Sequence, residues 1–230
     1  MTRHIGIVAC SAEGAALCYR TVCTEAEAMM GEHRHPETSL HGLPFADYNE
    51  CLFRGDWAGV ADMMARSAEK LARLGADFAI CPDNTIHEAF DAAVSTSPIP
   101  WLHIADAVAD AATTKGYRRV GITGTKYLVS GPVYPTALER AGIAWLRPDE
   151  AARERMNDII FGELVKGVFT DEARGVFNGI FAELGSAGCD AIVMGCTEIP
   201  ILMDGVATPL PTLDSTRLLA RAAIRHALSP

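Results

Sequence analysis

The sequence contains no long hydrophobic run, although 49% of its 230 residues are hydrophobic. None of its apolar stretches approaches the roughly 18 uninterrupted residues that a membrane-spanning helix needs, so no membrane contact is expected. The first residues lead directly into an apolar, strand-like segment and lack the cleavage site of a signal peptide. A chain of this length can bury one or two hydrophobic cores.

Clusters of lysine and arginine are also missing, and the formal net charge is −9. Nucleic-acid binding needs a basic surface against the phosphates, so no nucleic-acid partner is expected. The seven cysteines form no CxxC pair and no spaced ligand set with the seven histidines, which argues against a disulfide scaffold and a zinc site. We expect a reduced, cytoplasmic protein without a metal. A GxxxxGK[ST] phosphate loop is absent, and no cofactor is predicted.

Short apolar runs alternate with longer amphipathic ones, a pattern typical of an α/β fold with mainly parallel strands. Strands are predicted at residues 5–9, 39–43, 77–81, 101–104, 119–123, 144–146, 191–194 and 210–211. Helices are predicted at residues 11–30, 56–74, 106–115, 133–140, 148–168, 170–187 and 215–228.

Two segments in the first half of the sequence resemble two segments in the second half, at nearly the same sequence offset. Ile5-Gly6-Ile7 resembles Val120-Gly121-Ile122 at an offset of 115, and 75–83 matches 188–196 without a gap at an offset of 113. Two matches at nearly one offset predict two copies of one α/β unit. We place an N-terminal half at residues 1–112, completed by a C-terminal helix at 214–230, and a C-terminal half at 113–213.

The repeat aligns Asp83 with Cys196, each just past an apolar strand. Ligands of open parallel sheets bind at the carboxyl ends of the strands. If two such halves face each other, these two side chains approach one ligand from opposite sides. Inversion of a carbon centre needs an acid/base on each face, so the expected site lies between the halves.

The residues around these two positions resemble known motifs. Cys81-Pro82-Asp83-Asn84-Thr85-Ile86-His87 and Gly195-Cys196-Thr197-Glu198-Ile199-Pro200 are similar to the Cys-Asn-Thr and Gly-Cys-Thr-Glu motifs of the aspartate/glutamate racemase family, which works without pyridoxal phosphate. The resemblance runs through most of the chain. It implies two pseudo-symmetric flavodoxin-like halves, each with a mainly parallel sheet flanked by helices, and a homodimer. It also implies a cofactor-independent amino-acid racemase, an isomerase that removes the α-proton and replaces it from the other face.

The resemblance makes Asp83 and Cys196 the expected catalytic pair. A thiol, with an ordinary pKa near about 8.5, suits proton transfer near neutrality. The predicted substrate-binding residues are short polar side chains of the motifs and turns, and two family-matching positions: Ser11, Tyr48, Asn84, Thr85, Thr125, Lys166 and Thr197. The alternatives are that Ser11 is only a helix N-cap, that Thr197 and Glu198 only cap a helix, and that Lys166 is solvated.

Two positions depart from the family pattern. Asp83 stands where the family's first cysteine precedes Asn-Thr, and Cys81, two residues earlier, is predicted to be a buried small hydrophobe. A carboxylate is a weaker base than a thiolate unless burial raises its pKa, so Asp83 alternatively binds an ammonium group. Asp47-Tyr48-Asn49 stands in the expected loop where aspartate racemases have Asp-Arg-Thr, which weakens the case for aspartate as substrate.

Three functions stay open at this point. The first is racemisation of a small amino acid. The second is a one-base reaction on the same fold, such as decarboxylation or cis–trans isomerisation of a dicarboxylate. The third is non-catalytic binding of a small acid by a protein that kept the cleft and lost one base.

Overall fold

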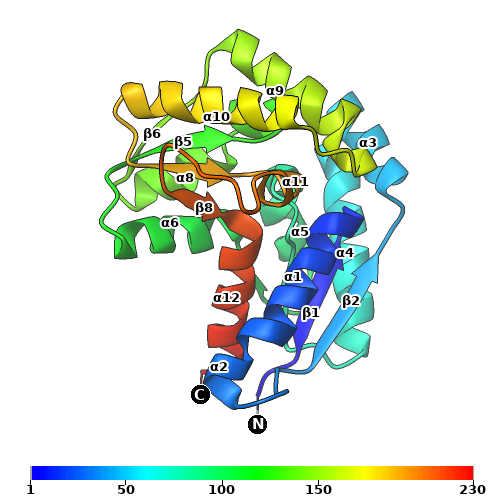
Figure 1. The fold of residues 1–230 in the computed structure, drawn as a ribbon. Coiled ribbons are helices and arrows are strands. Elements are labelled where there is room, and N and C mark those ends of the chain that lie inside the picture. The colour runs from blue at the N-terminus through cyan, green and yellow to red at the C-terminus, as the bar shows by residue number, and fades with distance from the viewer. Residues whose placement is uncertain (1, 230) are drawn as a thin grey trace. The chain divides into compact units, whose positions relative to one another are not determined.

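The computed structural model describes residues 2–229, and the chain divides into two units (Figure 1). Unit 1 runs to Ala107 and resumes at Thr216, whereas unit 2 comprises Val108–Ser215. Each unit contains one four-stranded parallel sheet flanked by helices, which confirms the predicted α/β fold of two similar halves. Among residues 2–229, no helix has both the length and the hydropathy needed to cross a membrane.

The sheet of unit 1 has the order β2-β1-β3-β4, and every neighbouring pair is parallel. Its strands are β1 (Ile5–Ala9), β2 (Thr38–Gly42), β3 (Phe78–Ile80) and β4 (Trp101–Leu102). Its helices are α1 (Ala12–Glu25), α2 (Glu27–Met30), α3 (Phe45–Arg54), α4 (Trp57–Arg73), the 3-10 helix η1 (Thr85–Ala89), α5 (Phe90–Thr96), the start of α6 (Ile104–Thr114) and α12 (Ser215–Leu228).

Both faces of this sheet are covered. On one face, Ile7 and Phe78 belong to a core that α1 and α12 complete, with Val22 and Ile224 among its members. On the other face, Val8 packs in a second core with side chains of α3 and α4. Burial on both faces explains why β1 and β3 read as continuous apolar runs without polar alternation.

Unit 2 repeats the same strand order, β6-β5-β7-β8, again with parallel pairs. Its strands are β5 (Arg119–Thr123), β6 (Ala144–Leu146), β7 (Ala191–Met194) and β8 (Thr212–Asp214). Its helices are the rest of α6, α7 (Lys126–Ser130), α8 (Val133–Arg140), α9 (Glu150–Gly162), the 3-10 helix η2 (Leu164–Lys166), α10 (Asp171–Ser186) and α11 (Glu198–Leu202).

The last predicted strand, at residues 210–211, is wrong. The strand there is β8, which begins at Thr212. Pro211 has no N–H to give to a ladder, and only its carbonyl takes part, accepting from the Ile192 N–H at 2.9 Å.

Two predicted helices are shorter than expected. The helix predicted at residues 11–30 is divided at Ala26 into α1 and α2. The one predicted at 148–168 ends at Gly162, because Glu163, at φ −124° and ψ −64°, leaves the helical conformation. The segment that follows is the separate turn η2.

The strand predicted at 101–104 and the loop predicted at 47–49 are also corrected. The strand ends at Leu102, because the His103 Nδ1 accepts from the Ala105 N–H at 3.1 Å and α6 starts at Ile104. Residues 47–49 lie within α3, where Tyr48 and Leu52, four residues apart, are both buried. Gly55, at φ 67°, ends this helix in the left-handed region.

Candidate active site

Asp83 and Cys196 lie at equivalent places in the two sheets. Asp83 follows β3, which lies between β1 and β4 in its sheet. Cys196 follows β7, which lies between β5 and β8 in the other sheet. Both residues are therefore at the carboxyl end of a parallel sheet, where ligands bind in open α/β folds. Their side chains are buried, with 9% and 8% of the residue exposed.

The carboxylate of Asp83 is held by backbone amides of the turn after β1. The Cys10 N–H donates to Oδ2 at 3.3 Å, and the Ser11 N–H lies 3.2 Å from both Oδ1 and Oδ2. These donors stand at the N-terminus of α1, where the helix dipole favours negative charge. Hydrogen bonds from backbone amides favour the ionised form of a carboxyl group. The contacts therefore fix the orientation of this side chain.

Ser11 also caps α1. Its backbone is extended, at φ −86° and ψ 147°, and its Oγ accepts from the Gly14 N–H at 3.3 Å. Ser11 is thus an N-cap, and its role in substrate binding stays a prediction. The same residue contributes an amide to Asp83, so capping does not separate Ser11 from the candidate site.

The buried ring of His87 contacts the main chain of Asp83. Nδ1 lies 2.8 Å from the Asp83 carbonyl, and Nε2 accepts from the Ile104 N–H at 3.4 Å. Burial, and then the neighbouring His103, lower the pKa of His87 well below its usual value. The ring is therefore neutral, with its proton on Nδ1. His87 lies inside the first motif, but no role for it was predicted from the sequence.

Tyr48 lies on α3 and is only 1% exposed. It belongs to the same core as Cys10 and Cys81. The Ser67 hydroxyl lies beside the Tyr48 hydroxyl, which makes no well-aligned hydrogen bond within residues 2–229. Burial and the nearby Cys81, Cys10 and Asp83 raise the pKa of the phenol, so Tyr48 is uncharged.

Cys81 is completely buried. Burial and the charge of Asp83 raise the pKa of its thiol well above the usual value. The thiolate is the reactive form of cysteine, so this environment keeps Cys81 inert. The prediction that Cys81 is a buried small hydrophobe is confirmed.

In unit 2, Cys196 is hydrogen-bonded to the carboxylate of Glu198. The Cys196 Sγ donates to Oε2 of Glu198 at 2.9 Å, and the Thr197 Oγ1 donates to the same oxygen at 2.8 Å. Thr197 stands at the start of α11, but its side chain makes no capping bond there. The alternative that Thr197 caps a helix is therefore wrong, and the three side chains form one hydrogen-bonded cluster.

Two glycines let the turns after β5 and β7 approach each other. The Gly195 N–H donates to the Thr123 carbonyl at 2.9 Å, and a Cβ on Gly195 would lie 2.7 Å from that oxygen. Gly124 has φ 152°, which side chains rarely allow. The next residue, Thr125, caps α7 by accepting from the Leu128 N–H at 3.2 Å. The close approach places Thr125 and Cys196 at the same edge of the sheet.

The other predicted binding residues differ in exposure. Asn84 is buried at the start of η1, and Thr85, the first residue of that helix, is partly buried. Lys166 is exposed at the end of η2, a turn that contacts α11. Within residues 2–229, no group of three or more His, Cys, Asp or Glu side chains is arranged to hold a metal.

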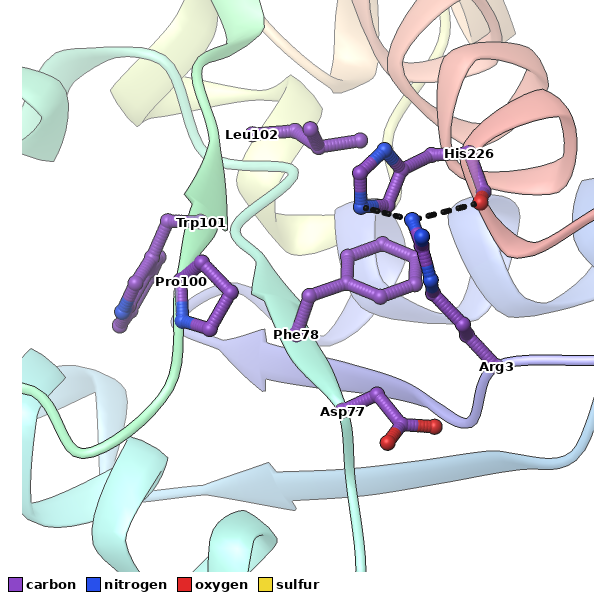
Figure 2. Close-up of a pocket in the computed structure, with 7 residues that line it drawn as sticks. All are labelled: Arg3, Asp77, Phe78, Pro100, Trp101, Leu102 and His226. Carbon is purple, nitrogen blue, oxygen red and sulfur yellow. Dashed lines mark hydrogen bonds between the residues drawn. The ribbon is translucent and has the colours of Figure 1, made fainter. Parts of the chain in front are cut away.

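A cavity of about 410 Å³ lies at the other end of the unit 1 sheet (Figure 2). Its lining comes from residues at or before the amino ends of β1, β3 and β4, from the last residue of β4 and from α12: Arg3, Asp77, Phe78, Pro100, Trp101, Leu102 and His226. The Arg3 Nη1 lies 3.1 Å from the His226 Nε2 and donates to the His226 carbonyl at 3.3 Å (Figure 2). These contacts tie the start of β1 to the end of α12. None of the predicted site residues lines this cavity.

A family sequence model and several known proteins are similar to this chain. The sequence model of the Asp/Glu/hydantoin racemase family matches residues 5–223. The broad-specificity amino-acid racemase RacX of Bacillus subtilis is 22% identical over 157 residues, which cover 68% of this chain and 67% of RacX. A solved structure of a candidate Asp/Glu racemase from Yersinia pestis shows 29% identity and a TM-score of 0.89, covering 99% of this chain and 100% of that one. PH1733, an aspartate racemase homologue from Pyrococcus horikoshii, shows 26% identity and a TM-score of 0.84 over 100% of both chains.

Proposed function

Because the chain belongs to the Asp/Glu/hydantoin racemase family, we propose that it is an amino-acid racemase that works without a cofactor. In this reaction a proton leaves the α-carbon and another proton returns on the opposite face. Cys196 and Asp83 are the proposed acid/base residues, acting on the same substrate. The observation that carries the proposal is the 2.9 Å hydrogen bond from the Cys196 Sγ to Glu198.

The contact with Glu198 gives Cys196 a route to the thiolate. Glu198 accepts the thiol proton, and the thiolate then takes the α-proton of the substrate, which leaves a carbanion stabilised by its carboxylate. Asp83, in its protonated form, adds its carboxyl proton to the other face; in the reverse direction its carboxylate, the form that the amides of Cys10 and Ser11 favour, takes the α-proton. Exchange with solvent then returns a proton from Glu198 to Asp83 and restores the starting state. A positioned acid/base of this kind contributes about 10²–10⁴-fold to a rate.

The environment of Asp83 also favours a second candidate function. Its carboxylate already accepts from the amides of Cys10 and Ser11, which suits a fixed negative charge. In this second candidate, Asp83 binds the ammonium group or another cationic part of the substrate, and Cys196 alone transfers protons. Such a one-base site catalyses decarboxylation or isomerisation without inversion.

Tyr48 bears on the substrate class. It stands where aspartate racemases have the arginine that binds the side-chain carboxylate, and it offers an uncharged, buried phenol. An acidic side chain would find no positive charge at this position. We therefore propose an amino acid with an uncharged side chain as the substrate, which agrees with the broad specificity in the name of RacX.

A cytoplasmic homodimer is the proposed working form of the protein.

The proposal is tested by incubating the protein with a panel of L- and D-amino acids in heavy water. Chiral chromatography and mass spectrometry then follow inversion and deuterium uptake at the α-carbon. A racemase gives deuterated product of both configurations from either enantiomer. Uptake without inversion supports the one-base candidate, and neither change with any amino acid refutes the racemase proposal.

Replacement of Cys196 tests the residue assignment. Cys196→Ser should lower kcat by about 10²–10⁴-fold, because a hydroxyl is a far weaker acid than a thiol. Cys189→Ser is the matched control, since Cys189 is a buried thiol of the same unit that precedes β7. We expect the control to retain kcat. An active Cys196→Ser variant with more than about a tenth of the normal rate would contradict the assignment.

A further inference from the structure

The loops that follow three strands of unit 1 meet at Asp83. The turn after β1 holds the carboxylate through the amides of Cys10 and Ser11. The 3-10 helix after β3 carries His87, whose Nδ1 contacts the Asp83 carbonyl at 2.8 Å. The start of α6, after β4, gives the Ile104 N–H to the other nitrogen of the same ring. Asp83 is thus held at its side chain and at its main chain by separate elements.

The contacts of His87 define its tautomer. A carbonyl accepts only, so Nδ1 carries the proton, and the N–H of Ile104 donates only, so Nε2 carries none. The ring stacks on Phe90 with centroids 5.3 Å apart and an interplanar angle of 10°, and the edge contact with His103 is 4.8 Å. These packing contacts leave the imidazole one orientation, in which both nitrogens are used.

The bond to the Asp83 carbonyl orients a whole peptide group. A peptide unit is planar, and its C=O and N–H point in opposite directions. Because His87 holds the carbonyl of Asp83, the N–H of Asn84 points away from the imidazole. One ring therefore sets the direction of the Asn84 amide and the backbone from which the Asp83 side chain projects.

We infer that His87 is a positioning residue, which fixes the peptide between Asp83 and Asn84 through its Nδ1–H and is itself held by the Ile104 amide. His87 does not touch the reacting atoms. The inference rests on the proposed function only in giving Asp83 a part in the reaction. Small displacements of a catalytic group lower the rate strongly, so loss of this bond should affect kcat more than KM.

Three variants separate positioning from general stability. His87→Phe keeps an aromatic ring against Phe90 and removes both hydrogen bonds, so kcat should fall by about 10–100-fold with a smaller change in KM. His87→Asn places an amide N–H near the position of Nδ1 and should recover most of that loss. Val60→Ala is the control, because Val60 is a buried side chain of α4 in the same core as Ile86 and Ala89 and makes none of the hydrogen bonds or ring contacts of His87. We expect this control to lower the melting temperature and to retain kcat.

The kinetic results overturn the inference if His87→Phe retains kcat, or if His87→Asn is as impaired as His87→Phe. A second measurement does not depend on turnover. The ¹⁵N chemical shifts of the His87 ring in the complete protein should show the Nδ1–H tautomer, with Nε2 unprotonated, at neutral pH. The Nε2–H tautomer would overturn the inference even if no racemisation is found. Absence of exchange in the unaltered protein, by contrast, refutes only the proposed function.

Discussion

At the scale of single residues, the proposed substrate class depends on Tyr48. The position is buried and apolar, and its neighbours include Cys10 and Cys81. An arginine there would bring a permanent charge and a planar pair of donors for a carboxylate. The phenol brings neither, so position 48 of α3 offers no cation to a substrate.

Replacing Tyr48 tests this account. Tyr48→Arg should raise kcat/KM for aspartate relative to alanine by about 10-fold or more, because a charged hydrogen bond to a carboxylate stabilises by roughly 1.5–3 kcal/mol. Tyr48→Phe should leave the preference unchanged, since it removes only the hydroxyl. The measurement is competition between the two substrates in heavy water. If Tyr48→Arg is poorly folded, the panel on the unaltered protein still decides, because a preference for aspartate or glutamate contradicts the account.

His87 links the pH to the stability of unit 1. Burial lowers the pKa of this ring in the folded protein, so the unfolded chain takes up the proton first as the pH falls. The contribution of the neutral ring to the free energy of unfolding is therefore complete above about pH 6.5 and declines as the pH falls toward the folded pKa. Urea unfolding of the normal protein and of His87→Asn, at several pH values, should show a stability difference that shrinks with acidification. A constant or growing difference would show that the folded ring takes up protons as readily as the unfolded one.

At the scale of secondary structure, Ser11 both caps α1 and donates its backbone N–H to Asp83 of the candidate site. Ser11→Ala should lower the free energy of unfolding by about 1 kcal/mol, because the Gly14 N–H loses its acceptor. Thr170→Ala is the matched control, since Thr170 caps α10 by accepting from the Ala173 N–H at 3.1 Å. Denaturant titrations should show similar losses for both variants. Only Ser11→Ala is expected to raise KM, and an unchanged KM would remove Ser11 from the substrate-binding residues.

The elements that the sequence analysis located have strong local signals. Buried parallel strands such as β1 and β7 read as continuous apolar runs, and long helices such as α4 show several turns of apolar periodicity. The elements that were not predicted are α3 and the short helices η1, α5 and α7, and α11 was expected only as a helix that Thr197 and Glu198 would cap. Most of these have too few turns for a period to be visible. Core contacts fix their conformation instead, and among them only α7 has a side-chain cap, from Thr125.

The main residues of the candidate site could also be predicted from the sequence, whereas their contacts could not. Asp83 and Cys196 were found because the repeat and the motifs mark them in the sequence. The amides of Cys10 and Ser11 lie more than 70 residues from Asp83, and nothing in the local sequence indicates that contact. The bond from Cys196 to Glu198 joins residues two apart, but a helix cap was an equally good interpretation until the side-chain directions were known.

At the scale of the whole molecule, the helix α12 follows unit 2 in the sequence but belongs to unit 1. The strand β8 of unit 2 leads directly into α12, which packs in the core of unit 1 with β1 and β3. In Figure 1, α12, coloured red, runs beside the blue α1. The Arg3 N–H donates to the Ala227 carbonyl at 3.0 Å, and Arg221 pairs with Glu25 of α1. Unit 1 therefore depends on residues far from its strands in sequence.

This dependence predicts where a defect in α12 acts. Ile224, 2% exposed, lies in the unit 1 core, so Ile224→Ala should cost about 2–5 kcal/mol of stability. Arg225→Ala is the control, because Arg225 is exposed and surface substitutions change stability by only about 0.5 kcal/mol.

Tryptophan fluorescence can assign that loss to a unit, since Trp57 and Trp101 belong to unit 1 and Trp145 belongs to unit 2. In one background, Phe replaces Trp57 and Trp145, so that only Trp101 reports. In the other, Phe replaces Trp57 and Trp101, so that only Trp145 reports. Ile224→Ala should move the unfolding midpoint of Trp101 to lower urea by at least as much as that of Trp145, since the removed side chain supports unit 1. A shift confined to Trp145 would mean that α12 stabilises the unit that precedes it in the chain, contrary to its packing against β1 and β3.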